Sequence, residues 1–102
     1  MDPLLEKYLS GYEYVLIDFY AEWCDPCKWV VPVLEEVSNH FMGRIRFGKI
    51  DIDHHPAISK ELAILSVPTL ILFSNQNEIW RMRGFEPAPA LIRTLEKQIV
   101  KV

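Results

Sequence analysis

Cysteine is scarce in this sequence: only two of its 102 residues are cysteines, Cys24 and Cys27, and both lie in the segment AEWCDPCK at 21–28. A chain of this length, half of it hydrophobic, can bury a core of its own and does not need disulfides as staples. A disulfide that closes so short a loop also removes little entropy from the unfolded chain. A purely structural crosslink is therefore disfavoured, and the pair is either a working dithiol or half of a metal site.

Sustained charge of one sign and long apolar runs are also missing. The formal net charge is −3 and neither sign forms a run, so nothing indicates a surface that recruits nucleic acid or an anionic membrane. The N-terminal segment MDPLLEKYLSGYEY has no long apolar core, which argues against a signal peptide and a transmembrane segment. We therefore expect a cytoplasmic protein. Thiols are kept reduced there, and a C-x-x-C pair is more often catalytic or metal-binding than structural.

Apolar spacing, caps and turn residues predict four helices and four strands. The expected strands are 14–21, 44–51, 69–73 and 78–83. The expected helices are 2–11, about 24–41 with a kink at Pro32, a short segment after Pro56 marked by Ile58, Leu62 and Leu65, and a last helix marked by Leu91, Ile92, Leu95 and Ile99.

This order of elements, α-β-α-β-α-β-β-α, predicts the fold class. Strands separated by helices favour parallel pairing, and the final two strands are close enough to form an antiparallel hairpin. The sequence shows no repeat, linker or low-complexity segment. We therefore expect a single α/β domain spanning 1–102, with helices on both faces of a mixed sheet.

The two cysteines fall where the first strand ends and the long helix begins. A helix N-terminus favours an anion, here the thiolate of Cys24, and helix N-termini and C-x-x-C motifs make a cysteine more acidic. Cys27, one turn later and more enclosed by its helix, would be the resolving thiol. Pro26 suits a first turn, which has no use for its missing N–H. A zinc site is the alternative, although only His40, His54 and His55 could complete its ligands.

Asp18 is an ionisable residue between Ile17 and Phe19 in a strand expected to be buried on both faces. Burial would raise its pKa and let it exchange a proton with Cys27. Lys49, on the neighbouring strand, could be its charge partner. Alternatively, Asp18 is simply hydrogen-bonded at a strand edge and Lys49 is an exposed lysine at a strand end.

The segment Val67-Pro68 precedes an apolar strand. A proline there can start the strand or occupy a tight turn and do no more. A cis bond would instead leave the backbone groups of Val67 free to pair with an extended peptide brought to Cys24.

From about Val15 onward, the chain resembles the thioredoxins. The resemblance rests on DFYAEWCDPCK at 18–28, Pro32, GKIDID at 48–53, VPTLILF at 67–73 and Gly84. It implies a thioredoxin fold in which Cys24 attacks, Cys27 resolves, Asp18 accepts a proton and Lys49 is its charge partner. It also implies a shallow substrate-binding surface made by Trp23, Pro26, Val67, cis-Pro68 and Gly84.

The chain departs from the family pattern in three places. Asp25 stands where glycine is typical, and its carboxylate would compete with the Cys24 thiolate for the helix dipole. The N-terminal region is too short for both the leading strand and the first helix, so we expect four strands, with 44–51 at an edge that its arginines protect. Tyr20 stands where tryptophan is common, and the turn at 75–77 lacks glycine.

Together these observations predict a protein-disulfide reductase that works by dithiol exchange without a metal or bound cofactor. The expected partners are protein disulfides and a thioredoxin reductase as electron donor, and the expected state is a monomer. An oxidase or isomerase would use the same residues. From another class, the alternative is a thioredoxin-like binding module or chaperone subunit whose dithiol is not essential.

Overall fold

The computed structural model describes residues 1–99, so the last three residues of the predicted domain, 100–102, lie outside the described residues. Eight elements follow one another in the order predicted from the sequence. They are α1 (Pro3–Leu9), β1 (Tyr14–Tyr20), α2 (Asp25–His40), β2 (Arg46–Asp51), α3 (Pro56–Glu61), β3 (Thr69–Ser74), β4 (Asn77–Arg83) and α4 (Ala88–Ile99).

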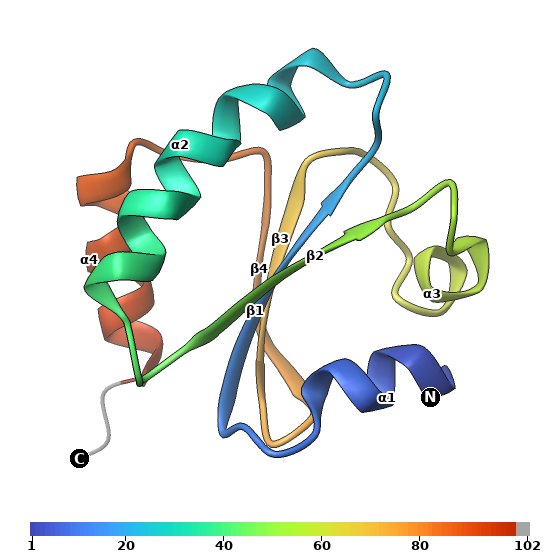
Figure 1. The fold of residues 1–102 in the computed structure, drawn as a ribbon, viewed down its shortest axis with the longest axis horizontal. Helices are drawn as coiled ribbons and strands as arrows, with labels where there is room; N and C mark the ends of the chain where they lie inside the picture. The colour runs from blue at the N-terminus through green and yellow to red at the C-terminus, as the bar shows by residue number, and fades with distance from the viewer. Residues whose placement is uncertain (100–102) are drawn as a thin grey trace.

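The four strands form one mixed sheet in the order β2-β1-β3-β4. β1 runs parallel to β2 and antiparallel to β3, and β3 and β4 form the expected antiparallel hairpin. β2 is therefore an edge strand, as the absence of a leading strand predicted. Figure 1 shows α2 and α4 on one side of the sheet and α1 and α3 on the other.

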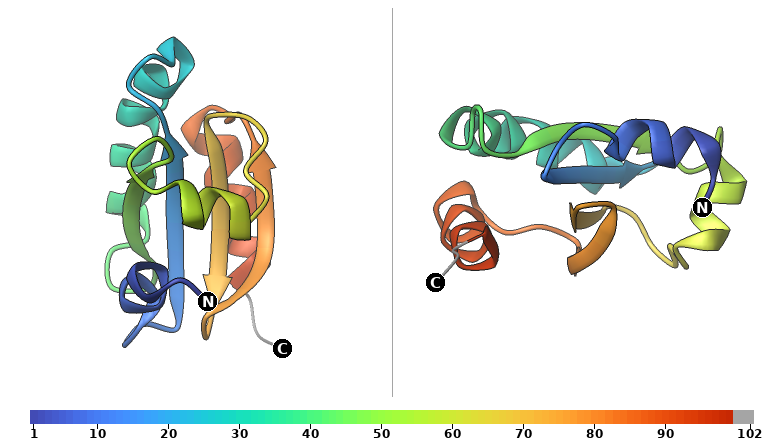
Figure 2. Two further views of the ribbon diagram at one scale, coloured as in Figure 1. Left: turned by 90° about the vertical axis from the view of Figure 1, so that its right-hand side faces the viewer. Right: turned by 90° about the horizontal axis from the view of Figure 1, so that it is seen from below.

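The core has two layers because side chains alternate between the faces of each strand. On the α1 and α3 side, Ile17 and Ile71 belong to one buried cluster. On the α2 and α4 side, Leu16 and Leu70 belong to another. β1 contributes to both clusters and is buried along nearly its whole length, which explains its almost unbroken apolar sequence. The two further views in Figure 2 show the helices lying over both faces.

The third helix is shorter than the sequence suggested. α3 ends at Glu61, and Ala63 adopts a left-handed conformation with φ of 52° that stops the helix. Leu65 is 76% exposed, so the prediction that it marks a buried helical stripe was wrong. Strand β2 also begins two residues later than predicted, at Arg46.

The edge strand β2 is covered in part by α1. The hydroxyl of Tyr8 donates to the carbonyl of Lys49 at 3.4 Å, and the Arg46 guanidinium donates to the carbonyl of Tyr8 at 3.3 Å. The same guanidinium lies 4.7 Å from the ring centroid of Tyr12. These contacts occupy part of an edge that would otherwise be open to pairing with another strand.

Candidate active site

The two cysteines lie at the N-terminus of α2, directly after the loop that leaves β1. Cys24 is the N-cap residue, and its Sγ accepts a hydrogen bond from the backbone N–H of Cys27 at 3.2 Å. The two residues form a disulfide with a Cα–Cα distance of 5.4 Å. Pro26 lies in the first turn, as predicted. The pair is thus close enough to cycle between a dithiol and a disulfide.

Burial does not distinguish the two cysteines. Each is 4% exposed, so the expectation that Cys27 is the more enclosed of the two was wrong for this oxidised form. Both belong to a small buried cluster with Ala21, against which Ile52 and Val67 pack. The predicted difference between their roles must therefore come from the helix terminus and the groups around each sulfur.

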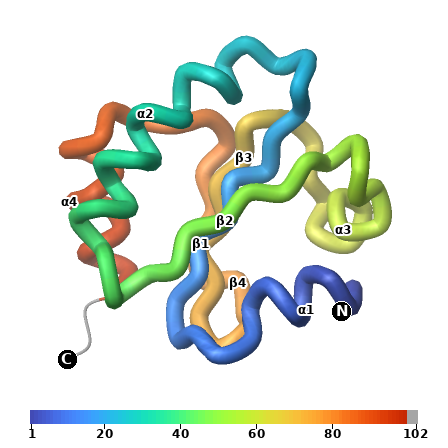
Figure 3. The backbone as a smooth tube through the Cα atoms, in the orientation of Figure 1, coloured from blue at the N-terminus to red at the C-terminus, as the bar shows by residue number. Residues whose placement is uncertain are grey.

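The loop before β3 brings a backbone acceptor to the disulfide. The Val67-Pro68 bond is cis, and the carbonyl oxygen of Val67 lies 3.6 Å from Cys24 Sγ. Gly84, at the end of β4, donates its N–H to the carbonyl of Pro68 at 2.7 Å and has φ of 94°, a conformation that favours glycine. The tube in Figure 3 traces how segments far apart in sequence converge at this end of the sheet.

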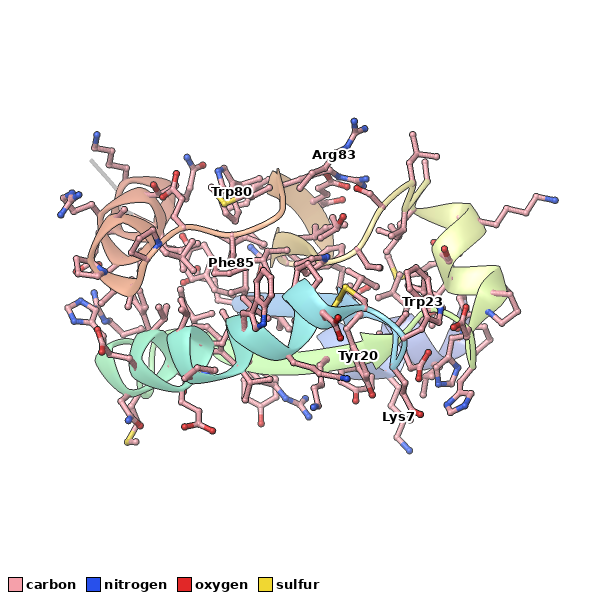
Figure 4. All side chains as sticks on the ribbon, turned by 90° about the horizontal axis from the view of Figure 1, so that it is seen from above. Lys7, Tyr20, Trp23, Trp80, Arg83 and Phe85 are labelled. Carbon is pink, nitrogen blue, oxygen red and sulfur yellow. A yellow bond between two sulfur atoms is a disulfide. The ribbon has the colours of Figure 1, made fainter. Side chains whose placement is uncertain are left out.

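Trp23 precedes Cys24, and its side chain lies beside the disulfide in an exposed position. Its side chain is 70% exposed, and its indole Nε1 donates to Asp53 Oδ2 at 2.8 Å. Figure 4 shows Trp23 beside the disulfide at this end of the molecule. Asp53 closes the GKIDID motif that supported the family resemblance, but it was not among the predicted site residues. The hydrogen bond fixes the orientation of an otherwise exposed indole.

Asp18 lies beneath the cysteines in β1 and is 3% exposed. Its pKa is raised from 3.8 to about 6, because the effect of burial exceeds that of a nearby positive charge. That charge belongs to Lys49, the register partner of Asp18 on β2, and it lowers the pKa. Among residues 1–99, nothing donates a hydrogen bond to its Oδ1 atom. Asp18 is thus buried with a raised pKa, and its role as a proton acceptor stays a prediction.

A cavity of about 410 Å³ connects Asp18 with the dithiol. Cys27, Asp18 and Lys49 all line it. The Lys49 ammonium lies 4.9 Å from the ring centroid of Tyr20, a cation–π contact that holds it at the rim. A proton leaving Cys27 thus has a buried carboxylate to reach within the same cavity.

The variant residue of the motif, Asp25, is the first residue of α2. Its carboxylate lies 3.6 Å from Lys28 Nζ, and the two side chains are 77% and 68% exposed. An exposed ion pair is weak, so Lys28 offsets only part of the repulsion between the Asp25 carboxylate and a nearby thiolate. The predicted competition between Asp25 and the Cys24 thiolate therefore stays a prediction for the reduced protein. Within the described part of the chain, no group of three or more His, Cys, Asp or Glu residues is placed to hold a metal ion.

Residues 5–97 match the family model described as Thioredoxin. The chain belongs to the thioredoxin family. It is 45% identical over 82 residues to a thioredoxin-like protein of Synechocystis, covering 80% of this chain and 78% of that one. It is 43% identical over 83 residues to a thioredoxin of Chlamydia caviae, covering 81% and 80% of the two chains.

A solved thioredoxin structure agrees with the architecture. A mutant thioredoxin from Halobacterium salinarum superposes with a TM-score of 0.87 at 30% identity, covering 100% of this chain and 88% of that one. The chain also matches a bifunctional thioredoxin reductase/thioredoxin of Mycobacterium leprae, at 40% identity over 85% of this chain but only 19% of that protein. No helix among the described residues is long and apolar enough to cross a membrane.

These findings confirm the predicted thioredoxin fold and assign the chain a thioredoxin-type activity. Within residues 1–99 the sheet has the four strands that were expected, with β2 at an edge. The cysteine pair is a redox pair at disulfide distance, as in a thiol-disulfide oxidoreductase. The enzyme is a protein-disulfide reductase of the thioredoxin type.

Proposed function

We propose that Cys24 is the attacking thiol and Cys27 the resolving thiol in the reduction of protein disulfides. The Cys24 thiolate attacks one sulfur of a substrate disulfide, which forms a Cys24–substrate mixed disulfide and releases the other substrate sulfur as a thiolate. Cys27 then gives up its proton, and its thiolate attacks Cys24 Sγ. This second exchange forms the Cys24–Cys27 disulfide and releases the reduced substrate.

Asp18 is proposed to take the proton of Cys27. Its raised pKa of about 6 leaves it mostly ionised at neutral pH yet basic enough to hold a proton transiently. The cavity that it shares with Cys27 provides the path, and Lys49 keeps the carboxylate from becoming too weak an acid. In this proposal Asp18 accepts the proton, and Lys49 adjusts the basicity of Asp18.

The substrate peptide is proposed to lie in extended form across the loop of the cis proline. The Val67 carbonyl, next to Cys24 Sγ, would accept a backbone hydrogen bond from it. Trp23 and Pro26 would form one side of this surface, and Gly84, bonded to Pro68, the other. The observation that carries the proposal is the position of the disulfide, at a helix N-terminus and facing the Val67 carbonyl.

A thioredoxin reductase is the proposed electron donor, and the cytoplasm the proposed location. The fusion of the two activities in the Mycobacterium leprae protein supports the first, since it joins a related domain to a reductase. The second rests on the proposed chemistry, because a reductase that works through a dithiol suits a compartment in which thiols are kept reduced.

The test is reduction of insulin disulfides, followed as turbidity with dithiothreitol as donor. Wild-type protein is expected to accelerate the reaction, and Cys24→Ser and Cys27→Ser to lose that acceleration. A wild type no faster than dithiothreitol alone would refute the proposal and favour a binding module. A Cys24→Ser protein with full activity in its native pathway would favour the same alternative.

A further inference from the structure

Two arginines project from one face of β4, and only one of them is used to hold the fold together. Arg81 pairs in register with Ile71, and Arg83 with Thr69, so both lie on the side of the sheet covered by α1 and α3. Arg81 Nε donates to Glu78 at 2.7 Å, and its Nη2 donates to the carbonyl of Leu62 at 2.8 Å. Its guanidinium therefore already binds groups within the protein.

Arg83 differs in that its guanidinium has no ion pair or hydrogen bond with any residue in 1–99. Its side chain is exposed at the last position of β4. Figure 4 shows it extending outward from the end of that strand. A fixed positive charge is thus available to a ligand at this end.

Backbone contacts connect Arg83 to the proposed substrate surface. Arg83 pairs with Thr69, which follows the cis proline. The next residue, Gly84, bonds the carbonyl of Pro68 at 2.7 Å, and Val67 reaches Cys24 Sγ at 3.6 Å. This short series of backbone contacts links the position of Arg83 to the loop that faces Cys24.

Three acidic side chains already have partners within the protein. Glu78 is held by Arg81, and Asp53 accepts from Trp23. Glu86 accepts from the hydroxyl of Thr94 at 3.5 Å. The protein's net charge of −3 would by itself repel an acidic peptide, so any preference for one must come from a local positive charge.

We propose that Arg83 is a specificity-determining residue that binds a carboxylate side chain of the substrate, located a few residues from the substrate's cysteine. The inference rests on the proposed function, since it assumes that Cys24 receives an extended peptide. The interaction is charge-assisted and exposed, so it tunes the choice among substrates and leaves the exchange chemistry unchanged.

The test uses short peptides that each form a disulfide-linked homodimer through one cysteine. Two pairs are needed, with Asp or Asn two residues before the cysteine in one pair and two residues after it in the other. Reduced protein is mixed with each peptide in a single turnover, and each rate is divided by the rate of the same peptide with dithiothreitol. This ratio removes the effect of the aspartate on the peptide's own disulfide.

Wild-type protein is expected to reduce the Asp peptide of at least one pair about twofold to fivefold faster than its Asn counterpart at low salt. Arg83→Ala should lose this preference while keeping the wild-type rate on the Asn peptide, and Arg83→Glu should reverse it. Arg93→Ala, which removes an exposed arginine from α4, changes the net charge equally and should keep the preference.

Three results would overturn the inference: no preference in the wild type, a preference that survives in Arg83→Ala, or one that Arg93→Ala also removes. The rates on the Asn peptides separate this failure from failure of the proposed function. If the wild type reduces those peptides no faster than a Cys24→Ser control, the exchange mechanism itself fails.

Discussion

Asp18 and Lys49 occupy paired positions on the parallel strands β1 and β2, yet no direct ion pair joins them among the described residues. The Lys49 ammonium lies instead over the ring of Tyr20. Its charge still lowers the Asp18 pKa, but burial outweighs it, and the pKa settles at about 6. The carboxylate is therefore more basic than an exposed aspartate, and the nearby lysine limits that increase.

Replacing Asp18 with asparagine is expected to stabilise the oxidised protein at neutral pH. The native carboxyl has a pKa of about 6 against 3.8 when unperturbed, so the native state binds more protons within this window and stability falls as the pH rises through it. At pH values above about 6, the buried Asp18 carboxylate lowers the free energy of unfolding by about 2–3 kcal/mol. Urea unfolding should therefore show Asp18→Asn gaining this amount over wild type between about pH 4 and about pH 8. An equal difference at both pH values would mean that Asp18 ionises normally.

Replacing Lys49 with methionine should raise the Asp18 pKa further above its value of about 6, because the nearby cation that favours the carboxylate is lost. The measurement is the carbon-13 chemical shift of the Asp18 carboxyl in the oxidised protein, followed against pH. Lys97→Met, on the last turn of α4, removes the same charge at a distance and should leave the titration unchanged. A titration that both variants move alike would point to net charge and not to Lys49.

Removing the charge of Asp25 should make Cys24 ionise at lower pH. Asp25 is the first residue of α2, so its carboxylate opposes the helix dipole that favours the thiolate. The rate of iodoacetamide alkylation of reduced protein against pH reports the ionisation midpoint. We expect this midpoint to fall in both Asp25→Gly and Asp25→Asn, and to rise in Lys28→Met, which leaves Asp25 without its partner at 3.6 Å. Unchanged or raised midpoints in the Asp25 variants would refute this electrostatic explanation.

Introducing a methyl group at Gly48 should destabilise the edge of the sheet. A Cβ atom there would lie 2.9 Å from Cε1 of the Tyr8 ring, so the ring must move. We expect Gly48→Ala to cost about 1–2 kcal/mol in urea unfolding. The cost should be smaller in a Tyr8→Ala background, where the obstacle is gone. Equal costs in the two backgrounds would place the effect in the strand itself.

Local sequence features were sufficient to predict most elements and the residues of the dithiol site. Cys24 follows a buried strand and precedes a helix, and this arrangement alone puts its sulfur at a helix N-terminus. Asp18 was identified because an acid inside an apolar strand is costly. Both inferences depend on neighbours in sequence, which periodicity and caps reveal.

Long-range contacts and unusual backbone conformations could not be predicted in the same way. The bond from Trp23 to Asp53 joins residues thirty apart, and neither residue shows locally that it has this partner. The end of α3 depends on the left-handed conformation of Ala63, a residue that ordinarily favours helices. Leu65 was therefore placed on a helix by its spacing, although it is exposed beyond the helix end.

Trapping of the mixed disulfide tests the central claim most directly, because the equal burial of the two cysteines does not rank them. Reduced Cys27→Ser and Cys24→Ser proteins are incubated with oxidised insulin, and covalent complexes are quantified by mass spectrometry after alkylation. We predict that Cys27→Ser accumulates a stable complex through Cys24, while Cys24→Ser forms little or none. A complex that forms mainly in Cys24→Ser would reverse the two roles, and equal trapping in both variants would contradict a dedicated attacking thiol.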